Sequence, residues 1–157
     1  MAGKAHRYAV AIEWTGNTGA GTQGYAGYSR DHQLTAADKP AIPGSSDPHF
    51  RGDADRWNPE ELLVGALAAC HQLWYLHLCA SAGIRVLAYR DAATGVMHEN
   101  GDCSGEFASV TLRPEVTLAP GDDVDRARAL HGEAARLCFI ARSVRFPVRH
   151  EPVFVTG

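Results

Sequence analysis

The 157 residues are enough for one domain with a hydrophobic core, or for a protomer whose core a partner completes, and we expect a single domain over residues 1–157. A net charge of −3 and a pI near 6.2 argue against nucleic acid or an anionic membrane surface as partners. The N-terminus has no apolar run typical of a secretion signal, and no run reaches the roughly 18 apolar residues of a membrane span. A cytoplasmic protein is therefore expected.

The first third of the chain predicts short strands and an irregular loop. Residues 7–14 alternate as in a strand, and residues 25–30 and 32–37 offer two more strands after a glycine-rich turn. An antiparallel meander is the simplest arrangement. Residues 38–57 contain three prolines and several other turn formers, so they predict an ordered loop, and loops of this length are often functional.

A long helix is predicted from Asn58 to Gly83. Asn58 and Glu61 can form a capping box, Pro59 suits the first helical position, and Gly83 suits the left-handed residue after the last turn. Such a helix runs roughly 36 Å and, being apolar on most sides, should cross the core. Its expected buried face contains Leu63, Leu67, Cys70, Trp74 and His77.

The remaining chain predicts strands, a second helix and a final strand. Residues 84–99 and 107–120 are rich in strand-forming side chains and are separated by turn formers. A second helix is predicted over residues 122–141, capped by its first residue, with Cys138 on its inward face. A final strand is predicted over residues 148–156.

This succession of elements indicates an α+β domain in which an antiparallel sheet covers one side of two long helices. The far side of the long helix then needs a cover of its own. A homodimer that packs the central helices of two protomers together would supply it.

The cysteines point to redox or packing roles rather than to a disulfide scaffold or a structural zinc site, because they are few and none form a C-x-x-C pair. Cys79 lies almost opposite Cys70 on the long helix, so these two cannot pair without unwinding it. Cys138 can pair with Cys70. Cys79 is expected to be a packing residue and Cys103 a surface residue.

A reactive Cys70 would need a cation close by, because the middle of a helix gains little from the macrodipole and burial raises a thiol pKa. The candidate cations are Arg30, Arg51 and Arg56. Glu60 could hold one of them in a bidentate ion pair. Glu60 and Cys70 are roughly 15 Å apart along the helix, so both serve one site only if the helix bends or if one comes from a second protomer.

A thiolate in an apolar pocket beside an arginine, with a second thiol in reach, suits attack on a peroxide. The expected course is a sulfenic acid on Cys70, then a Cys70–Cys138 disulfide that an external dithiol reduces. The surrounding Leu, Trp and Phe side chains favour an organic hydroperoxide over hydrogen peroxide, because its tail gains apolar burial. No bound cofactor or metal is expected.

The stretch NPEELLVGALAAC, residues 58–70, resembles the signature of the osmotically inducible protein C and organic hydroperoxide resistance proteins, the OsmC/Ohr superfamily. The resemblance covers essentially the whole chain, and CHQLWYLHL after the first cysteine indicates a less characterised OsmC-like branch. It implies an intertwined α+β homodimer with two long central helices. It also implies reduction of organic hydroperoxides in oxidative stress defence, with a lipoyl-type dithiol as reductant.

The resemblance also implies roles for individual residues. Cys70 matches the peroxidatic cysteine, Cys138 the resolving cysteine and Glu60 the carboxylate that orients an arginine. Arg51 lies closest to the place of that arginine, one residue out of register. Arg30 and Arg56 remain alternatives.

Two other functions are compatible with the sequence. The first is a non-catalytic stress or small-ligand-binding protein that keeps the scaffold. The second is a metal site made of Cys70, His71 and His77, which is disfavoured because consecutive helical residues lie about 100° apart and converge poorly on one ion. We expect His71 and His77 to be core or interface residues, which is more common for such histidines than binding a metal ion.

Overall fold

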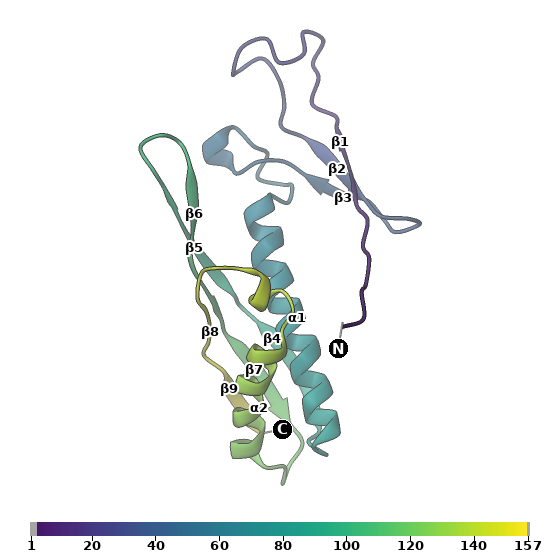
Figure 1. Cartoon of the computed structure of the whole chain (residues 1–157), viewed down its shortest axis with the longest axis vertical. Helices are drawn as coiled ribbons and strands as arrows, with labels where there is room; N and C mark the ends of the chain where they lie inside the picture. Colours follow the sequence, from purple (N-terminus) through teal and green to yellow (C-terminus); the bar gives the residue numbers. More distant parts are fainter. Residues whose placement is uncertain (1–2, 157) are drawn as a thin grey trace. The chain divides into compact units, whose positions relative to one another are not determined.

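A computed structural model describes residues 3–156, and the chain divides into one compact unit that ends at Leu62 and another that begins at Leu63. The first unit contains a three-stranded antiparallel sheet in the order β1 (Ala11–Trp14), β2 (His32–Thr35) and β3 (Ile42–Gly44), followed by the short 3-10 helix η1 (Pro48–Phe50) (Figure 1). An antiparallel meander is confirmed, but one of its three strands is not the one predicted.

Two details of the first unit differ from the prediction. Residues 25–30 form bends and turns instead of a strand, because the Gly27 N–H closes a turn on the Gly24 carbonyl at 3.0 Å and Gly24 takes a positive φ of 78°. The predicted loop contains β3, in which Ile42 pairs with Leu34 of β2.

The helix α1 (Pro59–Ser81) has the predicted limits. Asn58 Oδ1 accepts from the Glu61 N–H at 2.8 Å, and a Glu61 carboxylate oxygen accepts from the Asn58 N–H at 3.3 Å, which is a reciprocal capping box. At the other end Gly83 has a φ of 73° and the Ile84 N–H donates to the Cys79 carbonyl at 2.9 Å. This is the Schellman ending that glycine favours.

The second unit contains two three-stranded sheets. One has the order β4 (Val86–Asp91), β7 (Pro114–Leu118), β9 (Val153–Thr156), and the other the order β5 (Thr94–Glu99), β6 (Gly105–Leu112), β8 (Val148–His150). The pairs β4–β7 and β5–β6 are antiparallel, whereas β6–β8 and β7–β9 are parallel, so both sheets are mixed. The predicted final strand is two strands, separated by Glu151 and Pro152.

The helix α2 (Val124–Leu137) is shorter than predicted. Asp123, not Asp122, is its N-cap and accepts from the Arg126 N–H at 2.9 Å. Asp122 instead accepts from the Arg85 backbone and guanidinium, at 2.6 and 2.7 Å. Cys138 ends the helix as its C-cap with a ψ of 114°, and the 3-10 helix η2 (Ala141–Ser143) follows.

The core of the second unit consists of one cluster between α1, α2 and β7 and another between α1 and β6. Every fourth residue of α1 is buried: Leu67, His71, Tyr75 and Cys79. The predicted buried face was therefore wrong by one position, about 100° of helix rotation, and only Leu67 is shared. Cys70 and Trp74 are half-buried and His77 is exposed. An α+β fold with two helices is confirmed.

By length and composition alone α1 could cross a membrane, since one 18-residue window has a mean hydropathy of 1.4. One such helix is weak evidence for a membrane span, and its buried stripe packs inside the protein, with Tyr75 and Cys79 beside α2 and β7 and Leu67 beside β6.

Candidate functional site

Cys70 and Cys138 meet where α1 passes the end of α2. Cys70 is half-buried on α1, and Cys138 is buried at the C-cap of α2. Both are free thiols, and they lie close enough together for Cys70 to raise the pKa of Cys138. The structure thus brings together the two cysteines that the sequence singled out, while Cys79 is buried elsewhere in the core and Cys103 is exposed.

The surroundings of Cys138 hold its proton. Burial is the main cause that raises the pKa of Cys138 to about 11, and the hydrogen bond with the Cys70 thiol adds to it. The Ala141 N–H donates to Cys138 Sγ at 3.4 Å, which acts weakly in the other direction. Cys138 is therefore a protonated thiol at neutral pH.

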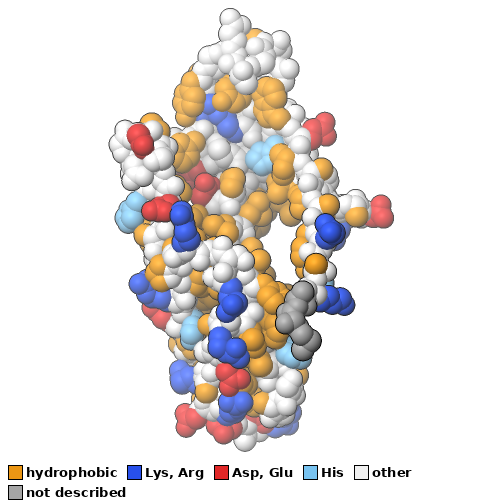
Figure 2. Space-filling model, in the orientation of Figure 1, with side chains coloured by type: hydrophobic (Ala, Val, Ile, Leu, Met, Phe, Trp, Pro, Cys, Tyr) orange, Lys and Arg blue, Asp and Glu red, His pale blue; other side chains and the backbone are white. Residues whose placement is uncertain are grey.

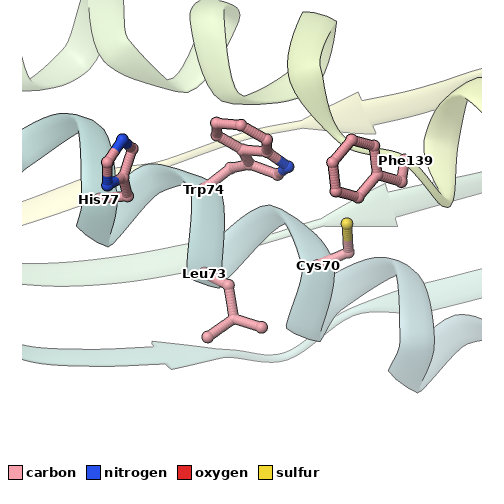
Figure 3. A pocket seen from close by; sticks show the side chains of 5 residues that line it. All are labelled: Cys70, Leu73, Trp74, His77 and Phe139. Atoms are coloured by element: carbon pink, nitrogen blue, oxygen red, sulfur yellow. The ribbon is translucent and has the colours of Figure 1, made fainter. Parts of the chain in front are cut away.

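Cys70 opens onto a pocket of about 340 Å³. The other lining residues are Leu73, Trp74, His77 and Phe139. Figure 3 shows the Cys70 thiol pointing toward the Phe139 ring, with the Trp74 ring beside it. Trp74 packs edge-on against Phe139, with ring centroids 5.5 Å apart. The lining is apolar except for the thiol and one imidazole, so the pocket suits a small molecule with an apolar body.

The three candidate arginines all belong to the first unit. Arg30 donates to the Tyr28 and Tyr25 carbonyls, each at 2.7 Å. Arg56 forms ion pairs with Asp31 at 3.4 Å and with Asp53 at 3.9 Å.

Arg51 is exposed, with its guanidinium 5.9 Å from the centre of the Tyr25 ring. Glu60 is half-buried in the first turn of α1. The roles predicted for Glu60 and for one arginine beside Cys70 stay predictions.

The structure separates the two histidines that follow Cys70 on α1. His77 is exposed and lines the pocket, whereas His71 is buried with its Nε2 at 2.9 Å from Nδ1 of His131. The metal site considered for Cys70, His71 and His77 therefore does not form. Across residues 3–156, no three His, Cys, Asp or Glu side chains are placed to hold a metal ion.

A cluster of three imidazoles, which the sequence analysis missed, lies on the inner side of Cys138. It consists of His71 on α1, His131 on α2 and His150 on β8, with ring centroids 5.2 to 6.1 Å apart. The His131 ring stacks on Tyr75 at 3.8 Å. Periodicity could have placed His131 inside, because it lies on the same face of α2 as Ala127 and Ala134.

The imidazole cluster is uncharged at neutral pH. Burial lowers the pKa of His71 to about 4, and the nearby His150 acts in the same direction. Burial and the neighbouring His71 lower the pKa of His131 to about 3. Burial also lowers the pKa of His150, which is half-buried. Each ring can therefore accept a proton without first losing one.

Comparison with known proteins identifies the family. The family described as OsmC-like protein matches residues 52–152. No curated protein matches the chain.

Solved structures match over nearly the full length. An OsmC-like protein of unknown function from Vibrio cholerae is 28% identical, with a TM-score of 0.85, covering 95% of this chain and 100% of that one. An organic hydroperoxide resistance protein OsmC from Legionella pneumophila is 16% identical with a TM-score of 0.70, covering 96% and 98%. The organic hydroperoxide resistance protein OhrB of Bacillus subtilis is 17% identical with a TM-score of 0.63, also covering 96% and 98%. With a family match over most of its length and this fold, the chain belongs to the OsmC-like protein family.

Proposed function

We propose that this protein is a thiol-dependent peroxidase that reduces organic hydroperoxides to alcohols in oxidative stress defence. The observation that carries the proposal is the proximity of the Cys70 and Cys138 thiols beside an open apolar pocket. The names of the Legionella and Bacillus proteins, both organic hydroperoxide resistance proteins, support the same chemistry.

The reaction uses one thiol to break the peroxide and the second to close a disulfide. The Cys70 thiolate attacks the terminal oxygen of the hydroperoxide, the O–O bond breaks, and the alkoxide takes a proton and leaves as the alcohol. Cys138 then attacks the sulfenic sulfur of Cys70, so that the S–S bond forms and hydroxide leaves as water. A dithiol of the lipoyl type returns two electrons by thiol–disulfide exchange, and no bound cofactor is needed.

The pocket sets the class of substrate. Leu73, Trp74 and Phe139 offer apolar surface to an alkyl or aryl tail, which a bare hydrogen peroxide lacks. We also propose that an arginine of the first unit, Arg51 first among the candidates, stabilises the Cys70 thiolate and is held by Glu60.

Counting free thiols tests the proposal. One equivalent of cumene hydroperoxide should remove two of the four thiols in the reduced protein and release one equivalent of cumyl alcohol. Peptide mapping should place the new disulfide between Cys70 and Cys138. An unchanged thiol count would instead favour a non-catalytic member of the family that binds small apolar ligands in the same pocket.

We further propose a cytoplasmic homodimer in which the partner covers the exposed apolar face of α1. Leu73 and Phe139 are 67% and 66% exposed although both are large apolar side chains. Figure 2 shows hydrophobic side chains at the surface of the region where α1 runs in Figure 1. Contiguous exposed apolar surface of this kind is typical of an interface.

A charge on this face is expected to break the dimer. Leu73→Glu should convert a dimer into monomers in light scattering, because a dimer would bury the new carboxylate without a partner. Leu87→Glu is the matched control, since Leu87 on β4 is also a leucine and is 61% exposed. A wild-type protein that is already monomeric, or a Leu73→Glu variant that stays dimeric, would contradict this interface.

A further inference from the structure

The disulfide-forming step needs a proton acceptor for Cys138. The attacking species is a thiolate, yet Cys138 is buried at 1% exposure and its thiol is protonated at neutral pH. The titratable groups of its immediate surroundings are few. Cys70 and His71 face it from α1 and His150 faces it from β8, while the Ala141 N–H is its backbone partner.

A small internal cavity joins Cys138 to two of the histidines. Its volume is about 30 Å³, enough for one water molecule. Three of its lining side chains are polar, Cys138, His71 and His150, and the others are Leu67, Leu112, Ala135, Ala141 and Val148. A buried water needs two to four polar partners, which these three can supply.

We propose that His150 accepts the Cys138 proton through a water molecule held in this cavity, and that the His71–His131 pair positions that water. The inference deepens the proposed function and rests on it for the pairing of Cys70 with Cys138. His150 is the exit of the relay because it is half-buried, whereas His71 and His131 are fully buried.

The step balances in atoms and electrons. Cys138 Sγ gives its proton to the water, which passes one of its own to His150, and the Sγ electron pair forms the S–S bond with the Cys70 sulfur. The S–O bond breaks and hydroxide takes a proton from solvent in the open pocket to leave as water. His150 then releases its proton to solvent.

Neutral imidazoles are what this relay requires. The groups facing His150 are His71 from α1, His131 from α2 and Cys138, and Arg128 of α2 also acts on His131. None of them is a carboxylate that would favour a permanently charged imidazolium. The 2.9 Å bond to His131 fixes the orientation of the His71 ring.

Closure of the disulfide can be measured without any peroxide. In a Cys103→Ser background, one equivalent of dithiobis(nitrobenzoate) should form a mixed disulfide with Cys70, the half-buried thiol that lines the pocket. Attack by Cys138 then releases a second coloured nitrothiobenzoate, and the rate of this release is the rate of closure.

In the Cys103→Ser protein with all its histidines in place, the closure rate should be nearly constant between about pH 7 and pH 9, because a neutral imidazole serves as the base throughout. In His150→Gln it should fall roughly 100-fold at neutral pH and rise about tenfold per pH unit, because hydroxide must then remove the proton. His98→Gln, an exposed histidine on β5, is the matched control and should behave as the wild type.

Two results would overturn the relay. One is a closure rate that rises tenfold per pH unit in the unsubstituted histidine background, a measurement that needs no variant to fold. The other is a His150→Gln protein that closes as fast and as independently of pH as the control. Because no peroxide is used, failure of the peroxidase proposal would leave this readout intact, and the two failures are distinguishable.

Discussion

Cys70→Ser is expected to abolish the reduction of organic hydroperoxides, with a loss in turnover of about 1,000-fold or more. A serine hydroxyl is not ionised near neutral pH and forms no sulfenic acid, so neither the O–O cleavage nor the disulfide can occur. The measurement is consumption of cumene hydroperoxide with a dithiol reductant. Cys103→Ser is the matched control, because Cys103 is the exposed thiol outside the site.

Cys138→Ser should separate the two halves of the same reaction. It is expected to reduce one equivalent of hydroperoxide and to stop with a sulfenic acid on Cys70, which a dimedone adduct would show by mass. Steady turnover with the dithiol should fall, because no resolving thiol is in contact with Cys70. Full activity of Cys70→Ser would mean that a different cysteine breaks the peroxide, and two thiols lost in Cys138→Ser would mean that a different cysteine closes the disulfide.

The sequence predicted the limits of α1 because its end signals are local. Asn58, Glu61 and Gly83 bond to groups within a few residues of themselves, so their roles follow from spacing alone. Which face of α1 is buried is not a local property. The helix is apolar on most sides, so only the packing of α2 and β7 decides that His71 and Tyr75, rather than Cys70 and Trp74, turn inward.

The end of α2 also could not be predicted from local sequence signals. The pattern predicted a helix that continues to Ala141, but the extended backbone at Cys138 stops it. The thiol then lies at a helix end, where the Ala141 N–H is free to donate to its sulfur. A cysteine in mid-helix would meet only side chains, so the observed cap changes the chemistry that Cys138 offers.

The imidazole cluster could not be predicted from spacing, because it depends on contacts between distant segments. His71 and His131 are 60 residues apart, and His150 joins them only because β8 pairs in parallel with β6. Parallel pairs need long connections and leave no turn signature in the sequence. Sequence motifs therefore indicate the two cysteines of the site, whereas only the tertiary fold brings the three imidazoles together.

The imidazole cluster makes the fold sensitive to acid. The folded-state pKa values of His71 and His131, about 4 and about 3, are below the ordinary histidine value of 6.5. Between these values the unfolded chain binds more protons than the folded one, so the free energy of unfolding falls as the pH drops below 6.5. At pH 5 the free energy of unfolding should be lower than at pH 7 by about 2 kcal/mol for each histidine. The two losses together should come to about 2 to 4 kcal/mol, because the two rings share a hydrogen bond and their protonation is not independent.

Urea unfolding at pH 7 and at pH 5, at one fixed protein concentration, measures this loss. Carboxylates with lowered pKa values, such as Asp122, begin to lose their stabilising charge only near the ordinary carboxyl value of 3.8, so they contribute little between pH 7 and pH 5. The half-buried Asp91 has a raised pKa and acts in the opposite direction, so it offsets part of the loss. His131→Leu should remove about half of the loss and His98→Gln none of it. Equal free energies of unfolding at the two pH values would contradict the prediction, because they would show that the imidazoles take up protons between pH 7 and pH 5 as readily in the folded protein as in the unfolded chain.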